Sequence, residues 1–257
     1  MPCYELETLT FKNPAFKKVG LSVLITMHDS TRRRQYMDQL ERYRPTKTVI
    51  ILHNKGFKNC KKPGVRTSVQ DLWHANLMAA RIANYDSVLI LEDDVEFLTN
   101  FRNDVSAVEK FWTRVHGPCA YNLGSLVHIS LPCTTDHIRV ILGGMTQAVL
   151  YNREATKRFP SIRVMSIPHD LKLSWTIKTY VYWRALTFQK LVETENSHMW
   201  NVAGIPMLIQ KGLLGMGSSQ QAFINSHNIA PAGGTLPYIV LYSIILLVLI
   251  SRMTRAK

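Results

Sequence analysis

The segment DSVLILEDDVEF, residues 86–97, decides the fold that we predict, because it joins an apolar run directly to three acids. The VLIL run at 88–91 has no polar side chain, which is typical of a strand buried on both faces of a parallel sheet. Glu92, Asp93 and Asp94 follow at once. A solvated turn in which Asp93 and Asp94 cap the next element is the alternative, but a buried strand that runs straight into three acids is uncommon in ordinary strand composition.

The segments around this strand alternate between strand and helix patterns. Buried strands are predicted at 21–27 (LSVLITM) and 47–54 (KTVIILHN), and the helix between them is capped by Asp29 or Ser30 and ended by Pro45. Further elements are predicted as a helix over 68–86, a helix at about 101–114, a strand near 123–130, and strand, Gly-Gly turn, strand and helix over 141–159. This alternation predicts an α/β domain built on a mainly parallel sheet.

Polar side chains gather where the three central strands end. His28 and Asp29 follow the first strand, His53 and Asn54 end the second, and the acids at 92–94 end the third. In open α/β sheets, ligands bind beyond the carboxyl ends of the strands. One candidate site is therefore expected at this edge of the sheet.

The three acids suit a hard divalent cation. Mg²⁺ and Mn²⁺ prefer oxygen ligands and commonly take one or two carboxylates together with phosphate and water. Because side chains alternate along a strand, Glu92 and Asp94 are expected on one side and Asp93 on the other. The sequence contains no Walker loop, nucleophile elbow or dinucleotide fingerprint that would compete with this interpretation.

The composition favours anionic partners. The chain has 257 residues and a net charge of +13, and residues 1–66 hold 14 Lys and Arg against 5 Asp and Glu. Such a surface attracts nucleotide phosphates, nucleic acid or an anionic membrane, although a solvated basic face is the simpler explanation for any single Lys. Four cysteines do not make a disulfide scaffold, and MPCYELETLTFKNPAF is too polar for a signal peptide, so a reducing compartment is expected.

The C-terminal segment differs in kind from the rest. Residues 236–250 (LPYIVLYSIILLVLI) carry no charge. As a helix they reach about 22 Å, so a span of the ~30 Å hydrocarbon core needs neighbouring residues as well. We predict an N-terminal extension (1–17), a catalytic domain (18–203), a linker (204–234), a single-pass membrane anchor (235–252) and a basic tail (253–257). The catalytic domain is expected to face the cytosol, and a buried C-terminal helix is the alternative to an anchor.

The acidic motif also suggests a family. VLILEDDVEF resembles the metal-binding motif of nucleotide-sugar glycosyltransferases with the A-type fold, and most closely the LILEDD form of glycosyltransferase family 25. Further segments of that group are similar, in this order, to SVLITMHDSTRRRQYMDQL, DLWHANLMAARIANYDSVLILEDD, GGMTQAVLYNREATKRF, IPHDLKLSW and ALTFQKLVETENS. The resemblance covers residues 18–200 and implies an A-type nucleotide-binding sheet. The chain departs from the family because we expect a C-terminal anchor in place of a signal peptide and retention tail.

The resemblance implies a reaction in which a sugar moves from a nucleotide-sugar donor to a hydroxyl group of a glycan, protein or lipid acceptor. Mn²⁺ or Mg²⁺ is the implied cofactor, with Asp94 and then Glu92 as ligands, while Asp93 is expected to hold ribose or sugar hydroxyls. If the anomeric centre inverts, a general base is needed. Asp170 is the candidate for it, with His169 as a metal ligand or phosphate contact. A capping role is the alternative for Asp170.

Three more residues are candidates for binding the donor. Arg32 and Arg33 lie near the start of the first predicted helix, where arginines and free backbone N–H groups can clamp a diphosphate. Three arginines in a row (32–34) cannot all face one site, so at least one is solvated. Asp71 is a candidate contact for the donor sugar or base, but Ser68-x-x-Asp71 also matches a capping box, which we favour.

Three other interpretations stay open at this point. Zinc-like spacings, in an unusual ligand order, join His116, Cys119, Cys133 and His137, although free thiols are the simpler explanation and a Cys119–Cys133 disulfide would require a lumenal domain. Carboxylates at a strand end also serve two-metal phosphoryl transfer, such as nuclease or nucleotidyl transfer. The third is a non-enzymatic basic protein that binds an anionic membrane or nucleic acid, whereas the transferase interpretation expects no nucleic acid partner.

Overall fold

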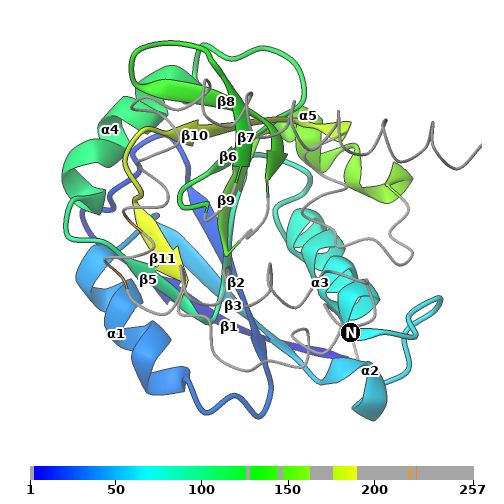
Figure 1. Cartoon of the computed structure of the whole chain (residues 1–257). Helices are drawn as coiled ribbons and strands as arrows, with labels where there is room; N and C mark the ends of the chain where they lie inside the picture. The colour runs from blue at the N-terminus through cyan, green and yellow to red at the C-terminus, as the bar shows by residue number, and fades with distance from the viewer. Residues whose placement is uncertain are drawn as a thin grey trace, which may run out of the picture.

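The computed structural model describes residues 3–125, 128–143, 147–162 and 176–189, with the single residues 220 and 224 further on. Its centre is a nine-stranded sheet of order β1-β3-β2-β4-β9-β6-β10-β8-β7, and β11 and β5 form a second, two-stranded sheet (Figure 1). The strands are β1 (Tyr4–Thr10), β2 (Leu21–Met27), β3 (Thr48–Asn54), β4 (Val88–Glu92), β5 (Val95–Phe97), β6 (Cys119–Asn122), β7 (His128–Pro132), β8 (His137–Gly143), β9 (Ala148–Tyr151), β10 (Lys178–Tyr182) and β11 (Thr187–Gln189). The helices are α1 (Arg33–Tyr43), α2 (Gly56–Asn59), α3 (Ser68–Ile82), α4 (Phe101–Trp112), α5 (Arg153–Thr156) and the 3₁₀ helix η1 (Phe159–Ser161).

The strand directions confirm the predicted parallel centre and add antiparallel strands around it. β2 pairs in parallel with both β3 and β4, as strands with uninterrupted apolar runs favour. β1 and β9 flank these three strands in antiparallel orientation, whereas β10 pairs in parallel with β6. The protein is therefore a mixed α/β domain in which β2, β3 and β4 all end at the same edge of the sheet.

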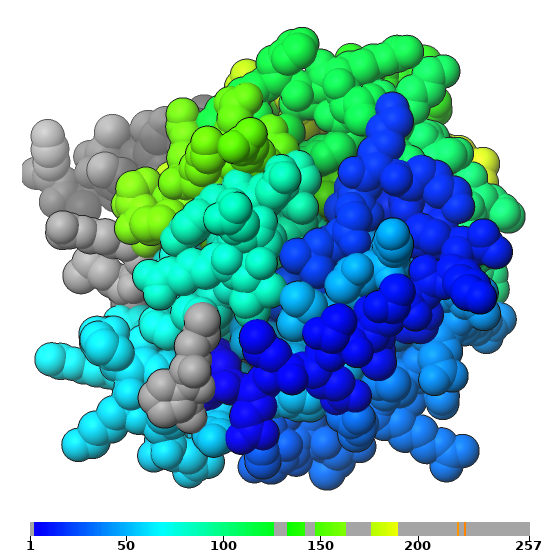
Figure 2. Space-filling model, turned by 180° about the vertical axis from the view of Figure 1, so that it is seen from behind, coloured from blue at the N-terminus to red at the C-terminus, as the bar shows by residue number. Residues whose placement is uncertain are grey.

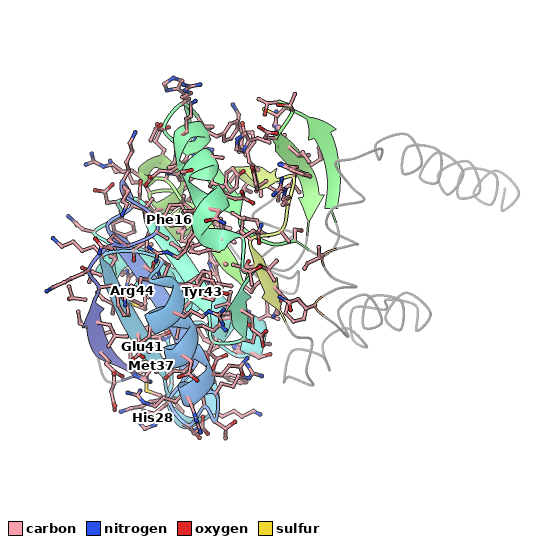
Figure 3. All side chains as sticks on the ribbon, turned by 90° about the vertical axis from the view of Figure 1, so that its left-hand side faces the viewer. Phe16, His28, Met37, Glu41, Tyr43 and Arg44 are labelled. Atoms are coloured by element: carbon pink, nitrogen blue, oxygen red, sulfur yellow. A yellow bond between two sulfur atoms is a disulfide. The ribbon has the colours of Figure 1, made fainter. Side chains whose placement is uncertain are left out.

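Alternating side chains on the central strands separate two helical layers. Leu24 and Leu91 face one buried cluster, which α1 and α4 cover with residues such as Leu40. Val23 and Ile90 face the other cluster, which α3, α5 and η1 cover. Figure 3 looks onto the first layer, with α1 and α4 in front of the sheet. Both faces of the central strands are thus buried, which explains the continuous apolar runs at 23–25, 49–52 and 88–91.

The N-terminal segment belongs to the sheet, contrary to the prediction of an extension over 1–17. β1 pairs with β3 along its whole length, from Tyr4 opposite Asn54 to Thr10 opposite Thr48. Figure 2 shows this segment, in blue, as a continuous band at the surface of the molecule. A disulfide between Cys3 and Cys60 fastens its start to the end of α2. The N-terminal residues are thus an edge strand, and the chain holds a disulfide that the expected reducing compartment did not lead us to predict.

Two other boundaries also differ from prediction. The strand expected near 123–130 is replaced by β6 and β7, with residues 126 and 127 outside the described part. Helix α1 begins at Arg33 instead of following an Asp29 or Ser30 cap, and its first flanking residue makes no side-chain capping hydrogen bond.

The predicted anchor (235–252) lies outside the described residues, and so does the linker (204–234) apart from 220 and 224. Among the helices that the structure does describe, none has both the length and the apolar character that a membrane crossing requires.

The small sheet brings a distant segment next to the acids. β11 pairs antiparallel with β5, which places Gln189 opposite Val95, the residue directly after the acids. The backbone N–H groups of Leu186 and Thr187 donate to the carbonyl oxygen of Leu123, at the end of β6. β11 is therefore attached both to β5 and to the central sheet.

The tight approach of β11 to the central sheet requires a glycine. A Cβ atom at Gly124 would lie 2.1 Å from the backbone oxygen of Thr187. We expect Gly124→Ala to lower the free energy of unfolding by roughly 1–3 kcal/mol, because the backbone of β11 must move away. Urea denaturation measures the change. Gly20→Ala is the control, since a Cβ there meets no atom within 4 Å. Equal stability of the two variants would contradict this account of the packing.

Candidate active site

The acids lie where β4 turns into β5. β4 ends at Glu92, Asp93 and Asp94 form a turn, and β5 begins at Val95. The alternation of side chains along the strand therefore stops at Glu92. It does not extend to Asp94, so the prediction that Glu92 and Asp94 lie on one side of a strand is wrong. The turn instead gives the two aspartates different surroundings, one half-buried and one buried.

Asp93 is held by three donors, one near the end of β2 and two from the connection between β2 and α1. Thr26 Oγ1 and Ser30 Oγ each donate to Oδ2 over 2.7 Å, and Arg32 Nη1 donates to Oδ1 over 2.9 Å. Charge-assisted bonds of this kind are roughly twice as strong as neutral ones. These contacts favour a structural role for Asp93, which links the end of β4 to the loop before α1. They argue against the predicted contact of Asp93 with ribose or sugar hydroxyls.

Asp94 is buried and its contact partner is neutral. Gln189 Nε2 donates to Oδ2 over 2.8 Å, while Arg32 Nη1 is 4.0 Å from the same oxygen. Oδ1 is buried and has no hydrogen-bond partner in the described part of the chain. Burial raises the pKa of Asp94 to about 6, with a smaller contribution from the charge of Asp93 and against the hydrogen bond from Gln189. The site thus contains a desolvated carboxylate oxygen that faces no donor in that part.

The two predicted arginines have different partners. Arg32 reaches the acids, whereas Arg33 donates twice to Glu7 on β1, over 2.9 and 2.8 Å. The Glu7 carboxylate raises the pKa of Arg33 and also lies 3.2 Å from Nε2 of His53. The structure therefore brings Arg32 to the candidate site and pairs Arg33 with the edge strand.

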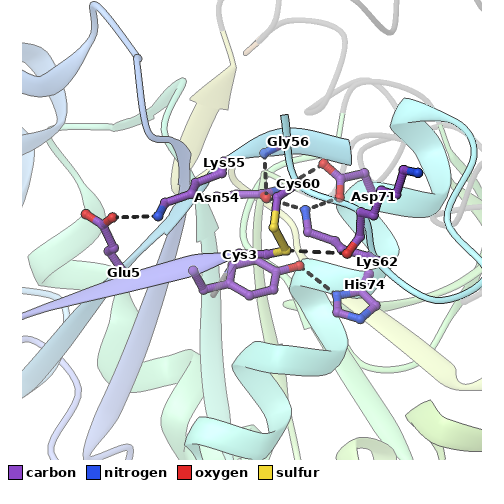
Figure 4. The surroundings of a disulfide bond; sticks show 11 residues. Cys3, Glu5, Asn54, Lys55, Gly56, Cys60, Lys62, Asp71 and His74 are labelled. Atoms are coloured by element: carbon purple, nitrogen blue, oxygen red, sulfur yellow. Dashed lines mark hydrogen bonds and ion pairs between the residues drawn. A yellow bond between two sulfur atoms is a disulfide. The ribbon is translucent and has the colours of Figure 1, made fainter. Parts of the chain in front are cut away.

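Asp71 is not part of a capping box, contrary to the interpretation that we favoured. Thr67 caps α3, and its hydroxyl accepts from the N–H of Gln70 over 3.2 Å. Asp71 is buried, pairs through Oδ1 with the ammonium group of Lys62, and accepts through Oδ2 from Asn54 Nδ2 over 3.0 Å (Figure 4). Protein groups bind both oxygens of this carboxylate. Asp71 therefore has a structural role at the carboxyl end of β3.

The zinc interpretation is wrong. No three His, Cys, Asp or Glu side chains among the described residues converge as a metal site would require. His137 Nδ1 instead pairs with the hydroxyl of Tyr121 over 2.6 Å, and burial lowers its pKa to about 4. Cys119 is buried and Cys133 exposed, and both are free thiols.

The acids fit a divalent cation in one respect and leave its coordination incomplete. Asp94 Oδ1 is an unpaired buried carboxylate oxygen in the described region, which is the kind of ligand that Mg²⁺ and Mn²⁺ bind. Glu92, Asp93 and Asp94 do not form a three-ligand cluster there. Mg²⁺ commonly keeps water and substrate phosphate oxygens beside one or two carboxylates. Asp94 therefore fits such a site, while Asp93 is already engaged.

The structure leaves two predicted residues untested and adds three. His169 and Asp170 lie outside the described residues, and their roles stay predictions. Thr26, Ser30 and Gln189 contact the acids without having been selected from the sequence. Thr26 had a recognisable signal, since it is a polar residue within a buried strand. For Gln189 the only signal was the resemblance of ALTFQKLVETENS to the family, because its partner lies 95 positions away.

Comparisons with known proteins give distant structural similarity. No family model and no curated protein sequence matches the chain. The structure of A197 from STIV is similar at 13% identity and a TM-score of 0.42, over 69% of this chain and 87% of that one. A glycosyltransferase involved in the glycosylation of the major capsid of PBCV-1 is similar at 11% identity and a TM-score of 0.44, over 70% of this chain and 98% of that one. Apo UDP-glucose pyrophosphorylase is similar at 8% identity and a TM-score of 0.38, over 75% of this chain and 82% of that one. Membership of family 25 stays a prediction.

The buried charge of Asp94 makes a stability prediction for the metal-free protein. Its folded-state pKa of about 6 exceeds the ordinary value of 3.8, so the folded protein binds this proton more tightly than the unfolded chain. Below pH 4 the burial of Asp94 does not lower the free energy of unfolding, and it lowers that free energy progressively as the pH rises to about 6. Asp94→Asn should therefore raise the free energy of unfolding above pH 6 by on the order of 2–3 kcal/mol, and much less near pH 4.

Urea denaturation in EDTA at a series of pH values measures this difference between Asp94→Asn and the wild type. Glu96→Gln is the control, because Glu96 lies on β5 and its carboxylate accepts a solvent-exposed hydrogen bond from Gln35 on α1. It should change the free energy by less than ~0.5 kcal/mol at every pH. A difference for Asp94→Asn that does not vary with pH would show that Asp94 is not a desolvated charge.

Proposed function

We propose that the chain is a metal-dependent glycosyltransferase that uses a nucleotide-sugar donor. The observation that carries the proposal is the buried carboxylate of Asp94, whose Oδ1 has no partner among the described residues. It follows β4, which pairs in parallel with β2, at the edge where α/β sheets bind ligands. The motif that supplies Asp94 also resembles the acidic motif of family 25 glycosyltransferases.

Under this proposal Asp94 holds Mn²⁺ or Mg²⁺, with Glu92 as a second protein ligand. When bound, such a cation stabilises the negative charge that develops on a departing nucleoside diphosphate. The surroundings of Asp94 support this role, because a carboxylate that loses its hydration without gaining a cationic partner in contact has much to gain from a metal ion.

Arg32 is the proposed contact for the donor diphosphate. A guanidinium group has five N–H donors in a fixed plane, and only Nη1 is used on Asp93. Asp93 therefore holds Arg32 at the sheet edge and fixes its orientation without using all of its donors. The hydroxyl groups of Thr26 and Ser30 fix Asp93 in turn. This arrangement supports a preorganised phosphate contact beside the proposed metal ligand.

The acceptor side of the proposal rests on the resemblance alone. Asp170 would take the proton of an acceptor hydroxyl on a glycan, protein or lipid, and His169 would contact the metal or a phosphate. An anchor at 235–252 would keep this reaction at a membrane.

Nucleotide release from a panel of nucleotide sugars tests the proposal. The full-length chain is assayed with Mn²⁺, with Mg²⁺ and with EDTA. We expect release of a nucleoside diphosphate from one donor, which requires metal. Asp94→Asn should lower kcat/KM by on the order of 10³-fold, because one metal ligand is lost.

Two controls make the assay specific. Glu96→Gln removes a half-buried acid from the same β-turn-β unit and should leave kcat/KM unchanged. Nucleoside triphosphates with sugar phosphates test nucleotidyl transfer, which would release pyrophosphate. Release of pyrophosphate alone would replace the proposal with nucleotidyl transfer. A folded protein that releases neither product and binds no nucleotide with metal would overturn the enzyme proposal in favour of a basic binding protein.

A further inference from the structure

Gln189 contacts the proposed metal ligand from a distant part of the chain. Its Nε2 donates to Asp94 Oδ2 over 2.8 Å, and Oδ1 of the same carboxylate stays unpaired within the described residues. A single hydrogen bond to one oxygen fixes the rotation of a carboxylate and so decides where its other oxygen points. The donor is an amide, which stays neutral at every pH of interest. It therefore orients Asp94 without neutralising the charge that attracts a cation.

The fold fixes Gln189 in this position. β11 pairs with β5 in a register that sets Gln189 opposite Val95, one residue after Asp94. The other end of β11 packs on Gly124, where no larger residue fits. Gln189 is therefore held by two backbone attachments, as a residue that orients a ligand should be.

We propose that Gln189 is a positioning residue, which turns the Asp94 carboxylate so that its unpaired oxygen receives the divalent cation. The inference rests on the proposed function, since it assumes a cation at Asp94. Loss of a partner that orients a metal ligand typically lowers metal affinity about 10–100-fold. Gln189→Met keeps the length of the side chain and removes the donor, so the same loss is expected here.

The test measures Mn²⁺ affinity by electron paramagnetic resonance of the free ion, with the full-length wild type, Gln189→Met and Asp94→Asn. The control is Gln35→Met, because Gln35 donates to Glu96 over 2.9 Å in an exposed pair beside the same sheet. Circular dichroism confirms that each variant is folded. We expect an affinity about ten-fold or more below the wild type for Gln189→Met, no binding at this site for Asp94→Asn, and no change for Gln35→Met.

The outcomes separate the two proposals. If the wild type binds Mn²⁺ through Asp94 and Gln189→Met binds it equally well, the role of Gln189 is overturned and the metal site stands. If the wild type and Asp94→Asn have the same affinity for Mn²⁺, no cation is bound at Asp94. Both the metal-dependent proposal and this inference are then overturned. If Gln35→Met loses as much affinity as Gln189→Met, the effect is not specific to Gln189, and the inference is overturned.

The Cys3–Cys60 disulfide bears on the compartment in which the domain folds. The Cα atoms of Cys3 and Cys60 are 5.5 Å apart, within the ordinary range for a disulfide. The pairing of β1 with β3 imposes this proximity, since Tyr4 lies opposite Asn54 and the Lys55 N–H donates to the Cys3 carbonyl over 3.1 Å. The bond borders the buried Lys62–Asp71 pair at the carboxyl end of β3 (Figure 4).

We infer that the domain matures in an oxidising compartment, and not on the cytosolic side that the sequence led us to expect. Structural disulfides persist in such compartments and are rare in the cytosol. The other two cysteines provide an internal reference, because Cys133 is an exposed free thiol and Cys119 a buried one.

Differential alkylation of the full-length protein in the cells that produce it tests this inference. At cell lysis a first alkylating label blocks the free thiols. Disulfides are then reduced, and the new thiols receive a second label, which mass spectrometry distinguishes from the first. We expect the second label on Cys3 and Cys60 and the first on Cys133. In Cys3→Ser, Cys60 should carry the first label. The first label on Cys3 and Cys60 of the wild-type protein would overturn the inference and place the domain in a reducing compartment.

Discussion

The candidate site depends on how the fold treats two adjacent negative charges. Asp93 and Asp94 repel each other, and the turn at the end of the buried strand gives their carboxylates different hydrogen-bond partners. Asp93 receives a guanidinium group and two hydroxyl groups, so its charge is compensated within the protein. Asp94 receives one neutral amide, and the nearest cationic group recorded for it is 4.0 Å away. The first carboxylate therefore stabilises the loop beside it, while the second keeps a charge that a ligand can satisfy.

The surrounding architecture makes this division possible. Parallel pairing of β2 with β4 places the connection to α1 beside the acids, which is why Thr26, Ser30 and Arg32 can all reach Asp93. The pairing of β5 with β11 covers the turn on its other side and excludes water from Asp94. Charged groups interact more strongly when water is excluded. Desolvation raises the pKa of Asp94, and for the same reason it would strengthen the attraction of a bound cation.

The sequence predicted the parts of the fold that local pattern determines. Uninterrupted apolar runs identified β2, β3 and β4, and helical periodicity identified α3. The pattern failed where partners are distant. β1 shows strand-like alternation, but its mostly exposed side chains hid the pairing with β3. Acids 92–94 marked the site through their position alone. The pairing of Asp94 with Gln189, and of Cys3 with Cys60, depends on how strands from different regions meet, which no local pattern specifies.

A comparison of two buried acids explains why only one of them is a candidate for binding a ligand. Asp71 and Asp94 both lie near the carboxyl ends of central strands, and both are at most 7% exposed. The oxygens of Asp71 are taken by Lys62 and Asn54, so removing it would leave an uncompensated ammonium group in the interior. The counter-charge that the described structure brings nearest to Asp94, Arg32 Nη1, stays 4.0 Å from Oδ2, and Oδ1 is unpaired there. Burial of a charge without compensation costs stability. A protein that needed Asp94 only for its fold would gain stability from a neutral residue there, so the retained carboxylate favours a function in binding.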